Sequence, residues 1–347
     1  MGSTCAGWRK DILSIVSLVV FGSTILFSGT VCAEDRQEFR DTGRLCVVDM
    51  GSNTFKFIVA EIKSGEYLQY VDDRKTAGVG DDLKASEKNS GHKVISEGKI
   101  KEILSLLARF QDECERQTRS RKMYGIATAA FREAENSKVI SQQLSQQGID
   151  VHILAGEEES VYAYEVATLG KPGFAVVDLG SRTTEFVTKS GAIYQWVELA
   201  TGYKVAWQEF YEKAETFNQA SAQHLEKLKG FIGEQKKEIL RNRQELVAVE
   251  VGETASYVLG IPQNQIEGKI ITRTQVQNKL KDLLAMDPKA FAELKGNFKD
   301  AEKVLPRLVF LEFILGETGY DRFRGTDREL NVAVVYRLSR AGQLQDR

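Results

Sequence analysis

The sequence predicts an α/β protein of two domains, each with a mixed sheet flanked by helices, that face each other across a cleft. Three observations predict this. The chain has 347 residues, which is more than a single core usually supports. Apolar runs typical of strands occur between segments of helical periodicity. A short motif occurs twice, as CVVDMGSNTFKFIV at residues 46–59 and as AVVDLGSRTTEFVT at residues 175–188.

Both copies of the motif predict the same hairpin. An apolar run such as residues 45–48 is typical of a strand buried on both faces, and it ends in Asp-x-Gly, where glycine permits a sharp turn. Strand character resumes at residues 54–62 in the first copy and 183–187 in the second. The hairpin tip offers a carboxylate, N–H groups and hydroxyls, which suit phosphate oxygens and hydrated Mg²⁺. One such tip is more often a plain β-turn, but two matching tips indicate a functional site.

The remaining elements follow from periodicity and turn residues. Between the copies, strands are predicted at 122–127 and 150–154, and helices at 96–119, 136–147 and 156–168. After the second copy, a strand is predicted at 246–251, and helices at 219–243, 252–259, 272–284 and 300–315. The apolar tail at 330–338 is predicted as a helix, with a strand as the alternative. Lys171-Pro172-Gly173 marks the boundary between predicted domains at 44–170 and 171–347.

The N-terminus has the order of a secretory signal peptide over residues 1–33. Arg9 and Lys10 precede an apolar run from Ile12 to Phe27, and the small residues Val31 and Ala33 stand where a peptidase site requires them. Cleavage after Ala33 predicts a periplasmic or secreted protein with no membrane span. The alternative is an uncleaved anchor, because the run is about as long as the shortest spanning helix.

Composition excludes several classes of protein. The formal net charge of -2 gives no basic surplus for nucleic acid, so no nucleic-acid partner is expected. The three histidines have no metal-ligand spacing, which argues against zinc. Cys46 and Cys114 remain after signal cleavage and could bridge in an oxidising compartment. Because one lies in a predicted buried strand and the other on a predicted helix, two buried thiols are expected instead.

Several segments resemble the exopolyphosphatase/guanosine pentaphosphatase (Ppx/GppA-like) family. The segments are VVDMGSNTFKFIVAEI at 47–62, GIATAAFREAEN at 125–136 and ILAGEEE at 153–159, in the family's order. The resemblance covers essentially all of residues 44–340. It implies the actin-like ATPase (ribonuclease H-like) fold in both domains. It also implies Mg²⁺-dependent hydrolysis of a terminal phosphoanhydride, on polyphosphate or a guanosine polyphosphate.

The resemblance also implies roles for individual residues. Asp49 and Asp178 would hold Mg²⁺ or its water shell, and Glu159, with its neighbour Glu158 as the second candidate, would orient or deprotonate the attacking water. The residues expected to contact phosphate are Gly51, Ser52, Asn53, Thr54, Arg132, Gly180, Ser181, Arg182 and Thr183. On local sequence alone, Glu157 to Glu159 are equally typical of a helix start that carries acids for the helix dipole.

The second half departs from the family pattern. Two glycines of the family's Asp-x-Gly-Gly-Gly-Ser-Thr-Glu loop are Ser181 and Arg182 here, where side chains could block close approach of phosphate. Two glycines of Gly-x-x-Gly-Thr are Glu250 and Glu253. The family's closing Leu-Arg-Glu-Gly is altered at residues 330–333, where its arginine and glutamate are absent. A shifted alignment on Arg328-Glu329 would keep both and still lose the glycine. We expect Arg182 to pair with Glu250 or Glu253 in the empty protein, since opposite charges introduced around one cleft are best tolerated together.

These observations favour a hydrolase and leave a second class open. The preferred function is a Mg²⁺-dependent phosphoanhydride or phosphate-ester hydrolase outside the cytoplasm, with terminal phosphoanhydrides as the expected substrates. The alternative is a catalytically degenerate binder that senses a phosphorylated or nucleotide ligand. A kinase ranks third, because ATP is scarce outside the cytoplasm. The sequence leaves assembly open, a homodimer included.

Overall fold

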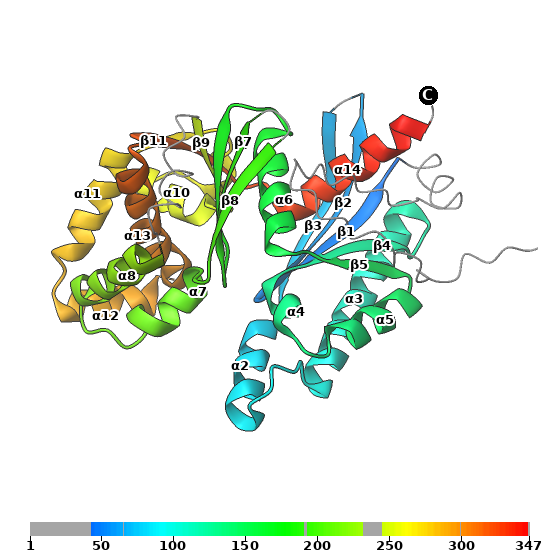
Figure 1. The fold of residues 1–347 in the computed structure, drawn as a ribbon, viewed down its shortest axis with the longest axis horizontal. Helices are drawn as coiled ribbons and strands as arrows, with labels where there is room; N and C mark the ends of the chain where they lie inside the picture. Colours follow the sequence, from blue (N-terminus) through cyan, green and yellow to red (C-terminus); the bar gives the residue numbers. More distant parts are fainter. Residues whose placement is uncertain (1–42, 65, 191–192, 232–244, 299, 346–347) are drawn as a thin grey trace, which may run out of the picture.

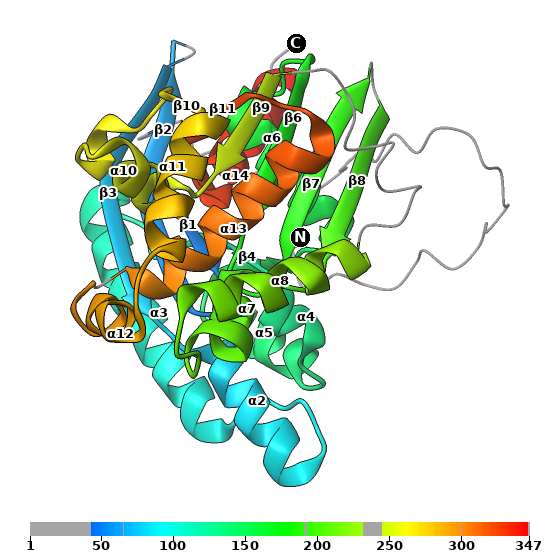
Figure 2. The same cartoon turned by 90° about the vertical axis from the view of Figure 1, so that its left-hand side faces the viewer.

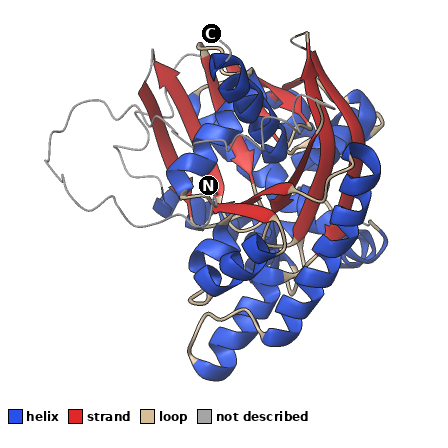
Figure 3. Ribbon diagram, turned by 90° about the vertical axis from the view of Figure 1, so that its right-hand side faces the viewer, coloured by secondary structure: helices blue, strands red, loops and turns tan. Residues whose placement is uncertain are grey.

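The computed structural model describes residues 43–64, 66–190, 193–231, 245–298 and 300–345. Two mixed sheets flanked by helices form its framework, which confirms the predicted fold class (Figure 1 and Figure 3). The predicted signal peptide lies outside the described residues. Among the described residues, no helix combines the length and apolar character that a membrane span requires.

The first half of the chain builds a five-stranded sheet with its helices. The elements are β1 (Leu45–Met50), β2 (Thr54–Lys63), β3 (Glu66–Thr76), α2 (Val79–Ser90), α3 (Glu97–Thr118), β4 (Met123–Ala127), α4 (Ala129–Glu133), α5 (Ser137–Gln146), β5 (Ile149–Ile153) and α6 (Gly156–Thr168). Helix α3 begins where predicted because the side chain of Ser96 accepts a hydrogen bond from the Lys99 N–H.

The second half builds a six-stranded sheet and a larger set of helices. The elements are β6 (Phe174–Leu179), β7 (Thr184–Ser190), β8 (Ile193–Leu199), α7 (Tyr203–Ala206), the π-helical turn η1 (Trp207–Tyr211), α8 (Phe217–Phe231), β9 (Glu245–Val249), α10 (Gly252–Leu259), the 3₁₀ turn η2 (Gln263–Gln265), β10 (Ile270–Thr272), α11 (Arg273–Leu284), α12 (Pro288–Asn297), α13 (Ala301–Thr318), β11 (Arg322–Thr326) and α14 (Leu330–Gln345). The tail is therefore a helix, and the predicted continuation of α8 to residue 243 falls outside the described residues.

The order of strands repeats between the two halves. The first sheet runs β3-β2-β1-β4-β5, and the second contains β8-β7-β6-β9-β11 with β10 added at its edge. In each half the first two strands form an antiparallel hairpin, and the first strand also pairs in parallel with a later strand, β4 or β9. The duplication predicted from the motif is therefore a duplication of topology.

Three hydrophobic cores hold the described sheets and helices together. One core fills the face of the first sheet that α2, α3, α4 and α5 cover. Another fills the face of the second sheet that α8 and α10 to α13 cover, and these helices stand in front of that sheet in Figure 2. The third core lies between the sheets and contains α6 and α14 (Figure 1). Strands β1 and β6 contribute to cores on both faces, which explains their uninterrupted apolar sequences.

Helix α14 bears on the predicted domain boundary. It packs against β1, β2 and α6, although the sequence assigns its residues to the second domain. The division at residue 170 therefore stays a prediction. The final helix ties the end of the chain to the first sheet, so the two halves share one central core.

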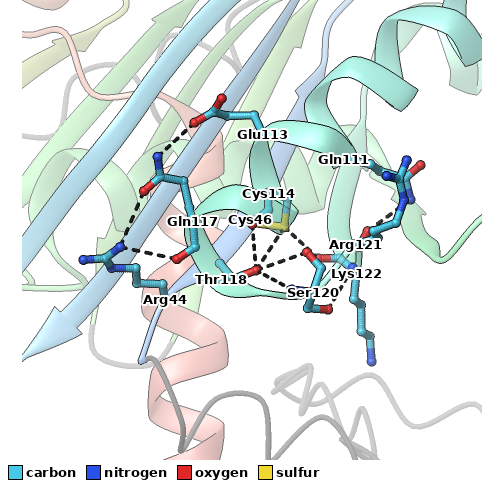
Figure 4. Close-up of a disulfide and its surroundings, with 10 residues drawn as sticks. All are labelled: Arg44, Cys46, Gln111, Glu113, Cys114, Gln117, Thr118, Ser120, Arg121 and Lys122. Carbon is cyan, nitrogen blue, oxygen red and sulfur yellow. Dashed lines mark hydrogen bonds between the residues drawn. A yellow bond between two sulfur atoms is a disulfide. The ribbon is translucent and has the colours of Figure 1, made fainter.

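The expectation of two free thiols is wrong. Cys46, at the start of β1, and Cys114, in the last turns of α3, form a disulfide, with their Cα atoms 5.9 Å apart (Figure 4). Both side chains are buried in the core between the first sheet and its helices. The disulfide can join a strand to a helix because α3 packs across the first sheet, and its C-terminal end lies over the start of β1.

Candidate active site between the two hairpin loops

The repeated motifs form matching hairpin tips. The Gly51 N–H donates to the Thr54 carbonyl at 3.2 Å. A Cβ atom added at Gly51 would meet the Thr54 oxygen at 2.9 Å, and one added at Gly180 would meet the Thr183 oxygen at 2.9 Å. Real Cβ atoms essentially never approach that closely, so both turns require glycine. The second tip is also backed by Gly202, whose added Cβ would lie 2.4 Å from the Gly180 oxygen.

A cavity of about 120 Å³ lies between the two tips. The predicted site residues that line it are Asp49, Gly51, Ser52, Asn53, Thr54, Glu159, Asp178, Gly180, Ser181, Arg182 and Thr183. Glu158 and Arg132 are not among the lining residues. The fold thus brings most of the predicted residues to one place, and their roles there stay predictions.

Three buried carboxyl groups form the acidic centre of this region. Asp49 and Asp178 occupy equivalent positions near the ends of β1 and β6, and Glu185 pairs with Asp178 across the second hairpin. Within the part of the chain that the structure describes, each has one carboxyl oxygen without a hydrogen-bond partner. Burial raises the pKa of Asp49 to about 8, and it raises the pKa of Asp178 and of Glu185 well above the ordinary value. Buried oxygens without partners are the kind that a cation satisfies.

The arrangement is compatible with the Mg²⁺ that the sequence predicts. Among the described residues, no three His, Cys, Asp or Glu side chains are grouped closely enough to hold a metal ion by themselves. Mg²⁺ does not need such a cage, because it is usually bound by one or two carboxylates, with water and substrate phosphates completing its shell. The oxygens of Asp49 and Asp178 fit that mode of binding.

Glu159 stands near the start of α6 as a buried carboxyl held by one arginine. Arg132 Nη1 lies 2.9 Å from Glu159 Oε2 and 2.8 Å from the Leu154 carbonyl oxygen. Burial, only partly offset by Arg132, raises the pKa of Glu159 to about 7. Such a carboxyl can accept a proton near neutral pH. In this structure Arg132 fixes the orientation of Glu159, which differs from the phosphate contact expected of it.

Glu158 has a structural role at the start of α6, and the catalytic role considered for it stays a prediction. Its side chain accepts a hydrogen bond from the Ala155 N–H at 2.9 Å and lies 3.2 Å from His152 Nε2. It therefore caps the first turn of α6. Glu159 remains the catalytic candidate.

The expected partners of Arg182 are wrong. Its guanidinium contacts Glu133 at the end of α4 through two bonds, Nε to Oε1 at 3.2 Å and Nη2 to Oε2 at 2.7 Å. Glu250 pairs with Lys56 at 2.5 Å, and Glu253 pairs with Lys303 at 2.6 Å. The side chain of Arg182 extends toward the first half of the chain, with Nη1 3.2 Å from where a Cβ of Gly80 would stand. Arg182 therefore pairs with an acid on a helix that belongs to the first sheet.

The pairing of Arg182 predicts the effect of one substitution. Glu133→Gln should raise the affinity for pyrophosphate about tenfold, because a phosphate no longer competes with a carboxylate for the guanidinium. Calorimetric titration measures this, with Glu135→Gln as the control, since Glu135 is an exposed acid that pairs with His92. Unchanged or weaker binding by Glu133→Gln would show that Arg182 does not reach the ligand.

Sequence reasoning missed five other charged residues that line the cavity among the described residues, namely Lys56, Arg74, Lys303, Arg307 and Asp327. Glu329 also lines it, and only the shifted alignment of the closing motif pointed to that residue. For two of these five residues the sequence pattern offered a signal. Lys56 lies directly opposite Asp49 in the hairpin register, and Arg307 interrupts an apolar run on α13. Arg307 is 3% exposed, and its Nε donates to the Leu179 carbonyl at 3.1 Å.

The fold and the site define a class of protein. Two sheets that share a strand order present matching Asp-x-Gly-Ser loops toward one cavity. The family model of the Ppx/GppA phosphatase family matches residues 58–315, so the chain belongs to that family. No protein with a curated description matches it by sequence.

Solved structures of the same fold agree with this assignment. The Ppx/GppA family member of Aquifex aeolicus is 18% identical, with a TM-score of 0.69 over 87% of this chain and 98% of that one. An exopolyphosphatase from Cytophaga hutchinsonii is 16% identical, with a TM-score of 0.70 over 86% of this chain and 98% of that one. At these identities the likeness shows the fold, which confirms the actin-like architecture.

Proposed function

We propose that the protein hydrolyses a terminal phosphoanhydride bond with the help of Mg²⁺, outside the cytoplasm. The observation that carries the proposal is the buried Glu159 carboxyl beside a cavity that two glycine-dependent hairpin loops enclose. Membership of the Ppx/GppA phosphatase family and the likeness to an exopolyphosphatase support the same reaction class.

Each part of the site has a task in this reaction. The loops at Gly51 and Gly180 present N–H groups and hydroxyls to phosphate oxygens. Glu159 accepts the proton of the attacking water at a carboxylate oxygen, and Arg132 holds that carboxylate in place. Asp49 and Asp178 would hold Mg²⁺, which when bound offsets phosphate charge.

The most direct support would come from a phosphate-release screen. The purified chain would be incubated with polyphosphates, guanosine pentaphosphate, nucleotides and simple phosphate esters, with Mg²⁺ or with a chelator. The proposal expects phosphate only from anhydrides and only with Mg²⁺. Release from esters alone, or release that a chelator does not reduce, would refute it.

The pKa of Glu159 predicts the pH dependence. The carboxyl must be deprotonated to accept a proton, and burial raises its pKa to about 7. We therefore expect kcat to rise about tenfold per pH unit below about pH 7 and to level off above it. Initial rates at saturating substrate across that range measure this. A rate that falls through neutral pH would mean that the essential carboxyl works as an acid.

A binder of phosphorylated ligands is the second candidate. The observation that favours it is the engagement of Arg182 by Glu133, which leaves the second loop without a free cation. Ligand binding without phosphate release in the same screen would identify this function.

The extracytoplasmic location is a further part of the proposal. The order of charges and apolar residues at 1–33 supports it, and the Cys46–Cys114 disulfide is typical of an oxidising compartment. N-terminal sequencing of the protein from an extracytoplasmic fraction should begin at Glu34. Full-length chain found only in the cytoplasm would contradict it.

A further inference from the structure

Every cation that lines the cavity is already engaged by a carboxylate. The pairs are Lys56 with Glu250 at 2.5 Å, Arg74 with Glu329 at 3.0 Å, Arg182 with Glu133 at 2.7 Å, Lys303 with Glu253 at 2.6 Å and Arg307 with Glu253 at 3.4 Å. Among the described residues that line the cavity, none of the five Lys and Arg side chains is therefore free to bind a chain of phosphates, as a site for a long polyanion would require.

Glu250 is held in a backbone conformation that disfavours it. Its φ is 56°, in the left-handed region where glycine is favoured. The residue follows β9, and its carboxylate reaches across to Lys56 on β2. Burial opposes the charged form, but Lys56 and Arg307 hold the pKa of Glu250 below its ordinary value, so the carboxylate stays ionised. A strained position with an ionised, partly buried side chain is typical of a functional constraint.

Glu253 likewise forms ion pairs with two other cations of the cavity. It lies in the first turn of α10 and binds both Lys303 and Arg307 of α13. Arg307 is fixed further by the Leu179 carbonyl and by the ring of Tyr203, whose centroid lies 4.3 Å from its Cζ. Neither cation is free to follow a chain of phosphates.

The small size of the cavity also favours a short ligand. Its volume of about 120 Å³ is well below the roughly 300–1,000 Å³ of pockets for drug-sized ligands. A chain of phosphates that starts between the hairpin tips and extends toward α10 would bring its oxygens toward Glu250 and Glu253. Like charges placed together oppose binding and act as a basis for discrimination.

We propose that the site selects short phosphoanhydrides, such as pyrophosphate or tripolyphosphate bound as the metal complex, and that Glu250 and Glu253 exclude long-chain polyphosphate. The carboxylates do so in two ways. They repel additional phosphates, and they occupy the cations that would otherwise bind them. This inference rests on the proposed function for the identity of the ligand, because it assumes that the cavity takes phosphoanhydrides.

Binding and turnover together test the inference. Calorimetric titration with Mg²⁺-tripolyphosphate and with long-chain polyphosphate would use the Glu159→Gln chain, which should bind without turnover. We expect at least about tenfold tighter binding of tripolyphosphate per binding site. Glu250→Gly relieves the backbone strain, and Glu253→Gln keeps the size of the side chain. Each should raise the affinity for the long chain about tenfold.

The control is Glu245→Gln, at the opposite end of β9 and paired with Arg324 outside the cavity. It should leave the length preference unchanged. Equal affinity for both ligands, no binding of either, or a preference that survives both cavity substitutions would overturn the inference. Phosphate release by the unsubstituted chain separates the two claims. Release without length preference would refute only the inference, and a length preference without release would refute only the hydrolase.

Discussion

Glu159→Gln is expected to lower phosphate release by roughly 10²-fold or more while the protein stays folded. The substitution keeps the shape of a buried side chain and removes only its ability to accept a proton. Arg132 can still donate to the amide oxygen, so the start of α6 keeps its contacts. The melting temperature should therefore change little. Initial rates and thermal unfolding of the same preparation measure the two effects.

Glu157→Gln is the matched control, because Glu157 is an exposed acid on the same turn of α6. It should leave turnover unchanged. If Glu159→Gln turns over at the rate of the unsubstituted chain, water is activated by another group, and Glu185 is the next buried carboxyl to test. If both variants lose activity equally, the charge of the helix start matters more than the position of one carboxylate.

Loss of the Cys46–Cys114 disulfide is expected to destabilise the protein by about 4 kcal/mol, on the entropic account of cross-links. The bridge closes a loop of 68 residues, which restricts the unfolded chain considerably. For a chain of this size, such a loss lowers the melting temperature by roughly 6 °C. Thermal unfolding of the Cys46→Ala, Cys114→Ala chain against the oxidised protein measures it.

Adding reductant to the unsubstituted protein supplies an independent comparison, since it leaves the core side chains in place. The reduced protein should melt at a temperature close to that of the doubly substituted chain. Equal melting temperatures with and without reductant, in protein whose disulfide is shown to be intact beforehand, would mean that the bridge contributes nothing to stability.

The sequence predicted the parts of the fold that depend on local pattern. Strands β1 and β6 are apolar throughout because each is buried on both faces, and the following Asp-x-Gly turn has a backbone that only glycine satisfies. These features recur in the second copy, so the duplicated topology was predictable. Strand β3 gave no clear signal, because Glu66–Thr76 is polar and pairs with β2 alone.

The electrostatics of the site were not predictable in the same way. Arg182 and Glu133 are 49 positions apart, and which acid meets the guanidinium depends on how the two sheets are placed. Lys56 and Glu250, 194 positions apart, meet for the same reason. The disulfide likewise depends on the packing of α3 across the first sheet. Residue types predicted most of the residues that line the cavity, whereas the choice of ionic partners required the tertiary structure.

The central claim is that water attacks a terminal phosphorus atom in this cavity, and isotope labelling tests it most directly. The purified chain would be incubated with tripolyphosphate and Mg²⁺ in water enriched in heavy oxygen, and the released phosphate would be analysed by mass spectrometry. The account predicts one heavy oxygen in each phosphate released by the first hydrolysis of tripolyphosphate, with release abolished by a chelator and lowered roughly 10²-fold or more by Glu159→Gln. Tight binding of tripolyphosphate with no labelled phosphate would contradict it and identify the protein as a binder.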